Sequence, residues 1–268
     1  MIEAYSLFSG STGNSYLIRD GHTQILIDAG RSCLAIEKSL GALGTSLSKI
    51  DAVFITHEHA DHTCGLEIIS KKFQLPVYMT APSYDNCVRG GSYLFRLAKR
   101  CPVLFKETIG TLCVASFEIP HDSRQNVGYI ISSCDDVFGI ATDMGHITEA
   151  IANNLSGCNK IILESNHDIK MLNEGPYPRF LKDRILSAKG HLSNESCGEL
   201  AAYLCDKGVK EITLAHLSRE NNLPSLAYET TRACLDKYGF ENVILKVAMP
   251  EITVCATDGK DYKNLWKG

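Results

Sequence analysis

Short apolar segments of strand length alternate with segments of helical periodicity along the chain. Asp-Gly-His at residues 20–22 predicts a hairpin between two strands. The helix expected over residues 82–100 contains Gly90 and Gly91, which would interrupt it. Its basic residues Arg89, Arg96, Lys99 and Arg100 are typical of a solvated face. In this half the pattern predicts strands at 2–7, 15–19, 24–28, 50–55 and 76–79, and helices at 33–43, 62–74 and 82–100.

The second half repeats the alternation. The pattern predicts strands at 103–105, 112–119, 127–132, 137–141, 160–163, 211–215, 243–247 and 252–256, and helices near 178–187, 194–206 and 226–238. No Pro/Ser-rich linker, composition shift or low-complexity segment divides the two halves, so we expect one domain over residues 1–268. Two α/β halves with sheets packed face to face and helices outside would form a four-layer αββα sandwich.

Composition narrows the class of protein. A hydrophobic fraction of 44% with 22% charged residues is typical of a soluble globular chain. The apolar runs are too short to cross a bilayer and the chain opens directly on a strand pattern, so we expect no membrane insertion. Eleven cysteines without a Cys-x-x-Cys pair fit a reducing cytoplasm. A net charge of −4 excludes a generally basic nucleic-acid-coating protein but allows a local basic groove.

The segment 55–62, Ile-Thr-His-Glu-His-Ala-Asp-His, concentrates metal-ligand chemistry between an expected strand and an expected helix. Zinc, iron and manganese all accept neutral imidazole and carboxylate. His57 and His59 share one face of an extended backbone, whereas the adjacent Asp61 and His62 diverge enough to reach a second ion. The pattern therefore predicts two divalent ions (Zn, Mn or Fe). Cys64 is close enough to be a ligand, but we interpret it as a packing residue because His and Asp already supply the donors.

This segment matches His-x-His-x-Asp-His and so resembles the metallo-β-lactamase fold. His121, at the end of an expected strand, and Asp143, at the end of another, would be ordinary residues in isolation. The resemblance implies that His121 is the third histidine ligand and that Asp143 is a carboxylate that bridges the two ions.

Two later motifs resemble the phosphodiesterase branch of this fold, as in RNase Z: Gly-His-Leu-Ser at 190–193 and Leu-Ala-His-Leu-Ser at 214–218. By that resemblance His191 contacts the scissile phosphate and His216 is the last ligand, with the reverse assignment left open. The helix after His191 could be capped by Ser193 or Asn194. His22, His146 and His167 match no motif.

The resemblance also implies how the ligands are divided between the two ions. One ion would be held by His57, His59 and His121 and the other by Asp61, His62 and His216, with Asp143 between them. A water between the ions would become the attacking hydroxide, His191 would act as the catalytic hydrogen-bond donor or acid, and Asp61 would orient the water. In this fold the first loop, Ser-Gly-Ser-x-Gly-Asn at 9–14, faces the metals, so Ser11 and Asn14 are expected to contact substrate.

The fold alone does not select the substrate. His59 argues against the flavodiiron branch, which carries Glu at that position. The basic residues Arg179, Lys182, Arg184 and Lys189 could contact a phosphate chain, or could form a plain surface helix. The 48-residue spacing from Asp143 to His191 is too short for the β-CASP cap domain of RNase J-type nucleases.

Across nearly the whole chain, these motifs, together with Glu-Ser-Asn-His-Asp at 164–168, resemble the YycJ (WalJ) group. That resemblance implies a cytoplasmic 5′-to-3′ exodeoxyribonuclease that acts on DNA and is linked to mismatch repair and cell-wall signalling. Two alternatives remain: a small-molecule hydrolase (cyclic phosphodiesterase, lactonase or thioesterase), and a non-catalytic metal-dependent signalling or binding protein. The sequence does not give the oligomeric state, and a homo-oligomer is possible.

Overall fold

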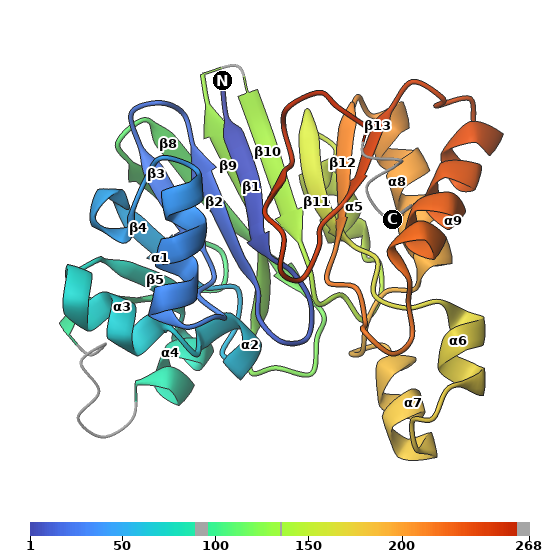
Figure 1. Cartoon of the computed structure of the whole chain (residues 1–268), viewed down its shortest axis with the longest axis horizontal. Helices are drawn as coiled ribbons and strands as arrows, with labels where there is room; N and C mark the ends of the chain where they lie inside the picture. The colour runs from blue at the N-terminus through green and yellow to red at the C-terminus, as the bar shows by residue number, and fades with distance from the viewer. Residues whose placement is uncertain (89–95, 135, 262–268) are drawn as a thin grey trace.

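Two seven-stranded sheets form the middle of the molecule (Figure 1). The computed structural model describes residues 1–88, 96–134 and 136–261. In the first sheet the strand order is β14-β1-β2-β3-β4-β5-β6. The strands from β14 to β3 pair antiparallel and those from β3 to β6 pair parallel. Their bounds are β1 Glu3–Phe8, β2 Ser15–Arg19, β3 Gln24–Ile27, β4 Ala52–Phe54, β5 Val77–Thr80, β6 Ala98–Cys101 and β14 Val254–Cys255.

The second sheet repeats this mixture of directions, with the order β13-β12-β11-β10-β9-β8-β7. Its antiparallel part runs from β7 to β10 and its parallel part from β10 to β13. The bounds are β7 Lys106–Ile109, β8 Leu112–Ile119, β9 Asn126–Ser133, β10 Asp136–Ala141, β11 Lys160–Glu164, β12 Glu211–Ala215 and β13 Ile244–Val247.

Helices cover the outer face of each sheet, and α6 and α7 project beyond the sandwich (Figure 1). Side chains of α1 and α3 pack on the first sheet, and those of α5, α8 and α9 on the second. The bounds are α1 Cys33–Ala42, η1 Leu47–Lys49, α2 Ala60–Thr63, α3 Leu66–Phe73, α4 Ala81–Cys87, α5 Glu149–Leu155, α6 Ile169–Glu174, α7 Arg179–Ile185, α8 Asn194–Asp206 and α9 Pro224–Lys237.

Three apolar layers explain why the strands are apolar on both faces. In β3, Ile25 and Ile27 belong to the cluster between the sheets, whereas Leu26 belongs to the cluster under α1 and α3. In β11, Ile162 points between the sheets and its neighbours pack under the other helices. Each fully buried Leu or Ile side chain contributes about 1.5–3 kcal/mol through removal of apolar area from water. The architecture confirms the expected four-layer αββα sandwich, and in the described chain between Asp143 and His191 no cap domain is inserted.

The prediction of one continuous helix over residues 62–74 is wrong. The structure has two helices, α2 and α3, separated at Gly65. A Cβ on Gly65 would lie 2.1 Å from the carbonyl oxygen of Arg31, and the Gly65 N–H donates to the carbonyl of Ala29 at 2.9 Å. The loop after β3 therefore passes too close for a side chain at this position. This contact between distant segments ends α2 directly after the ligand segment.

The long helix expected over residues 82–100 is also wrong. The helix α4 ends at Cys87, and β6 pairs parallel with β5, so pairing at the sheet edge overrides the helical pattern. Lys99 and Arg100 are exposed, as expected, but they lie on this strand. Arg89, Gly90 and Gly91 lie outside the described residues.

Smaller differences have local causes. No strand forms at residues 103–105: Phe105 packs between the sheets and its N–H donates to Ser116 Oγ at 2.8 Å, so the ladder begins one residue later at β7. The short helices α5 and α6 were not expected, and side chains of Thr148 and Asp168 cap them. Ser193 caps α8, which is one of the two expected caps.

Candidate metal centre

The ligand-type side chains follow strands that end at the same edge of the sandwich. The segment with His57, His59, Asp61 and His62 follows β4, and the other three candidates each follow a different strand of the second sheet. His121 follows β8, Asp143 follows β10 and His216 follows β12. Because the two sheets are packed face to face, these strand ends meet across the core.

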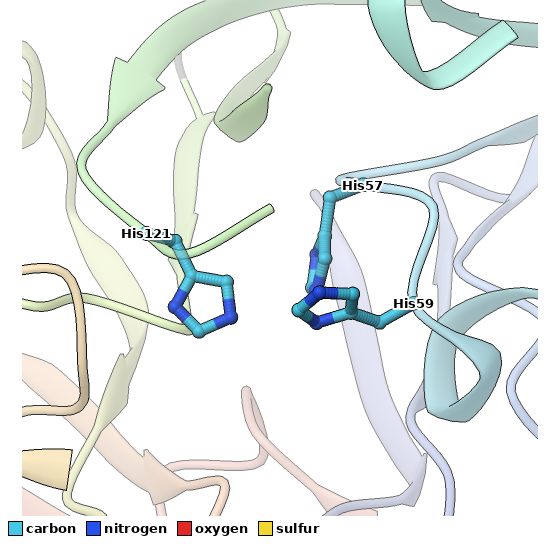
Figure 2. A group of neighbouring side chains, drawn as sticks. All are labelled: His57, His59 and His121. Carbon is cyan, nitrogen blue, oxygen red and sulfur yellow. The ribbon is translucent and has the colours of Figure 1, made fainter. Parts of the chain in front are cut away.

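One group consists of His57, His59 and His121, whose ligand atoms lie within 4.8 Å of one another. Their ring centroids are 4.5 Å (His57 to His59), 5.1 Å (His57 to His121) and 5.2 Å (His59 to His121) apart. Figure 2 shows the three rings turned toward a common space. The structure thus brings together the three residues expected to hold the first ion.

A second group adjoins the first and consists of Asp61, His62 and His216, again within 4.8 Å. Asp143 lies between the groups: its Oδ2 is 3.3 Å from His62 Nε2, and its Oδ1 is 3.5 Å from His216 Nε2 and 3.7 Å from His121 Nε2. Two ligands at about 2.1 Å from a tetrahedral zinc are about 3.4 Å apart, so these separations are those of atoms that share an ion. This is the geometry expected of a carboxylate shared by both groups.

The donor atoms fit a metal because they lack other partners. His57 Nε2, His216 Nε2 and Asp143 Oδ2 are buried and have no hydrogen-bond partner among the described residues. An unpaired buried polar atom costs about 1–3 kcal/mol, so it is uncommon in a native structure without an ion or a water to satisfy it. Three such atoms within one cluster of imidazoles and carboxylates fit divalent metal ions.

The environment shifts the pKa values of the candidate ligand histidines in two directions: it lowers those of His57 and His121 and raises those of His62 and His216. Burial lowers the pKa of His57 and of His121, which leaves neutral imidazoles with lone pairs for a cation. Burial also disfavours a charged His216, yet the carboxylates of Asp143, Asp61 and Glu164 raise its pKa to about 10. These carboxylates concentrate negative charge that divalent ions would neutralise.

Backbone conformation helps to aim the side chains. Asp28, Asp143 and His216 have φ angles of 61°, 58° and 58°, in the left-handed region that non-glycine residues rarely occupy. Asp28 and His216 directly follow β3 and β12, and Asp143 lies two residues after the end of β10. The left-handed turn redirects the chain, and this local strain is typical of functional sites.

Asp28 orients the second group and was not identified from the sequence. Its Oδ2 lies 2.7 Å from His62 Nδ1, and both side chains are fully buried. It also accepts hydrogen bonds from the Thr56 N–H at 2.8 Å and from Thr56 Oγ1 at 2.9 Å. The carboxylate thus fixes the Nδ1–H tautomer of His62 and leaves Nε2 for a metal. An isolated Asp at the end of an apolar strand was the only sequence signal.

Glu164 orients His191 and His216 as Asp28 orients His62. The motif at 164–168 did not assign Glu164 a role. Its Oε1 lies 2.8 Å from His191 Nδ1 and 3.0 Å from His216 Nδ1. Its Oε2 accepts from the backbone N–H groups of Met144 and Leu192. Burial would raise the pKa of Glu164, but His191 and His216 lower it, so the fully buried carboxylate is ionised. One side chain therefore sets the orientation of both rings.

Glu164→Gln is expected to lower metal affinity and turnover by about 10- to 100-fold, because an amide cannot accept from two imidazole N–H groups through a charged oxygen. Metal content and kcat, measured with and without excess metal, check this. Glu118→Gln is the matched control, because Glu118 is exposed and its carboxylate accepts a hydrogen bond from Gln125 at the surface. Unchanged metal affinity in Glu164→Gln would contradict the assigned role.

A pocket of about 260 Å³ lies beside the two groups. Its walls include Ser11, His191 and Arg184 together with the ligands His59, Asp61, His121, Asp143 and His216. His191 is partly exposed there, with its Nδ1 held by Glu164. The pocket therefore brings together most of the residues to which the sequence analysis assigned ligand, catalytic or substrate roles.

Three residues that were expected to contact substrate do not line this pocket. Asn14 is fully buried and does not line the pocket; its Nδ2 donates to Gly10 O and lies 3.1 Å from His62 Nε2, so it braces the first loop against the ligands. Arg179 pairs with Asp183, and Lys182 donates to the carbonyls of residues 173 and 175. Neither lines the pocket, because helical spacing turns Arg184 toward it instead. Arg184 is also paired with Asp122 there.

Cys64 is exposed, so it is not the packing residue that the sequence analysis expected. Cys64 donates to the carbonyl of Gly30 and belongs to none of the candidate ligand groups found among the described residues. All eleven cysteines are described, and all are free thiols. In the described part of the chain, every helix is too short or too polar to cross a bilayer.

The fold and the paired ligand groups define a metal-dependent hydrolase of the metallo-β-lactamase class. A beta-lactamase superfamily domain matches residues 23–217. The chain is also 32% identical to exodeoxyribonuclease YycJ of Bacillus anthracis over 241 residues, which is 87% of this chain and 89% of that protein. This chain belongs to the beta-lactamase superfamily and, within it, to the family of the YycJ and WalJ exodeoxyribonucleases.

Further comparisons agree with this placement. Exodeoxyribonuclease WalJ of Streptococcus pneumoniae is 32% identical over 228 residues, 84% of each chain. Among solved structures, the metallo-β-lactamase fold protein YhfI from Bacillus subtilis superposes with a TM-score of 0.70 at 15% identity, over 95% of this chain and 99% of that one. Zinc-bound PqqB from Methylobacterium extorquens gives 0.69 at 17% identity, with the same coverage. The two structural likenesses support the fold.

Proposed function

We propose that this protein is a dinuclear metal-dependent phosphodiesterase that degrades DNA as a 5′-to-3′ exodeoxyribonuclease. The observation that carries the proposal is the position of Asp143 between the two ligand groups. Its Oδ1 lies 3.7 Å from His121 Nε2 of one group and 3.5 Å from His216 Nε2 of the other, and its Oδ2 lies 3.3 Å from His62 Nε2. His191 stands at the wall of the same pocket. The names of the relatives YycJ and WalJ support DNA as the substrate. The 5′-to-3′ direction and a role in DNA repair follow from the family resemblance. Eleven free thiols support action in a reducing cytoplasm.

The proposed ligands are His57, His59 and His121 for one ion, Asp61, His62 and His216 for the other, and Asp143 for both. Bound zinc, manganese or iron would lower the pKa of a water and polarise a phosphoryl oxygen. The pKa of Asp61 lies below its ordinary value despite burial, because His216 and His62 pair with the carboxylate, which would accept a hydrogen bond from that water and orient it. His191 Nδ1 donates to Glu164. When Nε2 also carries a proton, its N–H donates to the phosphate or passes that proton to the leaving oxygen, which leaves a neutral ring.

Arg184 is the proposed phosphate-chain contact, and Arg179 on the same helix supplies a matched control. Arg184→Ala is expected to raise KM for DNA several-fold and to reduce the magnitude of the slope of log KM against log salt by about 0.7–0.9, since one cation near the phosphates is lost. Arg179 is 88% exposed and pairs with Asp183, so Arg179→Ala should change neither quantity. KM measured between 50 and 200 mM salt checks the pair. Equal effects in both variants would contradict the assignment of Arg184.

The test of the proposed function uses single- and double-stranded DNA labelled at the 5′ or the 3′ end, with protein loaded separately with zinc, manganese or iron. We expect release of short products from the 5′ end and loss of activity on chelation. Elemental analysis should give two ions per chain. A cyclic nucleotide, a lactone and a thioester run in parallel. Turnover of one of these without DNA cleavage would favour the small-molecule hydrolase, and metal binding without any turnover would favour the non-catalytic alternative.

A further inference from the structure

A second pocket, of about 240 Å³, adjoins the metal centre and shares His191 with it. It lies between the loop after β10, the start of α6, the end of α7 and the start of α8. We call it the side pocket. Its lining includes His167, His191 and the apolar side chains of Ile147, Ile169 and Leu186. Apart from His191, no residue that the sequence analysis expected to bind substrate lies in it.

His167 is the unusual member of the side pocket. The residue is 1% exposed, yet neither Nδ1 nor Nε2 has a hydrogen-bond partner among the described residues. Leaving a buried polar group unpaired costs about 1–3 kcal/mol, which a purely structural residue would avoid. Burial lowers the pKa of His167 to about 4, so the neutral ring offers one donor and one acceptor.

The backbone holds His167 rigidly in place. Its carbonyl accepts from the Asn194 N–H at 2.9 Å, and it forms a parallel bridge with Ser193 at the start of α8. The preceding residue, Asn166, donates to the carbonyl of the candidate ligand His216 at 2.8 Å. The ring therefore has a fixed position relative to the metal centre, as a recognition residue requires.

Apolar side chains flank the opening. Ile169 and Leu186 are 40% and 47% exposed, and both line the side pocket together with Ile147. Exposed large apolar side chains around one buried polar group are the usual composition of a small-molecule site. Ordinary ligand pockets measure about 300–1,000 Å³, so this one suits a group smaller than a whole nucleotide.

We propose that the side pocket binds the nucleobase of the nucleotide next to the scissile phosphate, with His167 hydrogen-bonding the base edge and Ile147, Ile169 and Leu186 contacting its faces. The inference rests on the proposed nuclease function. His191 lines both pockets, so a phosphate beside His191 has its own base within reach of the side pocket. A planar base with donors and acceptors at its edge matches both the neutral imidazole and the apolar walls.

The kinetic test compares DNA that ends in a normal nucleotide with the same DNA ending in an abasic tetrahydrofuran residue. In the wild-type protein we expect kcat/KM to be roughly tenfold higher for the base-containing end, the value of one buried hydrogen bond. His167→Leu should bring this ratio close to one. Leu186→Asp, at an exposed position, should also lower it. Both kcat/KM values of this ratio are measured on the same variant. A substitution that changes the metal centre in general affects both values equally and leaves the ratio unchanged.

His167→Leu also distinguishes a role of His167 in ligand recognition from a role in stabilising the fold. Replacing an unpaired buried imidazole by an apolar side chain should leave Tm equal or higher, whereas a structural hydrogen-bonding role would lower it. His22→Leu, at an exposed turn, is the matched control and should keep the wild-type ratio. An unchanged ratio in both His167→Leu and Leu186→Asp would overturn the proposal.

A binding experiment tests the side pocket without catalysis. In metal-free protein with ¹⁵N-labelled histidine, the ring signals of His167, assigned by their absence in His167→Leu, should shift on titration with deoxyadenosine. Inorganic phosphate should leave them unchanged. A shift with phosphate alone, or with neither probe, overturns the nucleobase assignment. If wild-type protein cleaves no DNA, the proposed function fails, and the deoxyadenosine titration still decides the side pocket.

Discussion

Asp143→Asn is expected to lower kcat/KM at least 10³-fold, which corresponds to about 4 kcal/mol of lost transition-state stabilisation. The substitution keeps the size of the side chain but removes the negative charge that faces His62, His121 and His216 at 3.3–3.7 Å. Because Asp143 adjoins both ligand groups, we expect both ions to bind more weakly. Metal content after dialysis and kcat/KM at increasing metal concentration measure the effect.

The control for this variant is Asp85→Asn, since Asp85 is a mostly exposed carboxylate that pairs with Arg100 at the surface. It should keep wild-type metal content and activity. A second comparison is Asp61→Asn, which touches only the second group and should reduce the content of one ion. If Asp143→Asn retains two ions per chain and full activity, the two groups do not share this carboxylate.

His191→Ala is expected to lower kcat by about 10²–10⁴-fold while metal content stays at the wild-type level. The ring of His191 is held by Glu164 at the pocket wall. Its Nδ1 is 3.9 Å from the nearest oxygen of Asp143, whereas the proposed ligands His62, His216 and His121 place their Nε2 atoms 3.3–3.7 Å from an Asp143 oxygen. His216→Ala should instead release metal, because His216 Nε2 lies 3.5 Å from Asp143 and 3.7 Å from Asp61.

This pair of variants decides between the two assignments that the sequence left open for the late histidines. If His191 is the ligand and His216 the catalytic donor, His191→Ala will release metal, and His216→Ala will lower kcat without loss of metal. The kcat–pH profile provides an additional check, because removal of an acid should abolish one limb of the profile. His22→Ala, remote from any assigned role, is the control for loss of an imidazole.

The sequence by itself determined the layer architecture and the ligand-bearing segments. Strands apolar at every position require cover on both faces, and their alternation with amphipathic helices leads to the sandwich. The cluster at residues 57–62 could be interpreted directly because four candidate ligands, three His and one Asp, fall within one local turn. For His121, Asp143, His191 and His216 only the family resemblance gave the expectation, because a single His or Asp at a strand end is chemically ordinary.

Tertiary structure decided what depends on contacts between distant segments. Asp28 and Glu164 act through histidines 34, 27 and 52 positions away in the sequence, and no local pattern marks such pairs. Helical geometry selects Arg184 over Arg179 and Lys182, and sheet pairing converts the end of an expected helix into β6. His167 lies within the segment 164–168, but only the structure shows that its ring is buried without a hydrogen-bond partner among the described residues. The sequence specifies which chemical groups are present. Packing determines which of these groups lie together in a small, largely buried volume, and their pKa values and metal affinity depend on those neighbours.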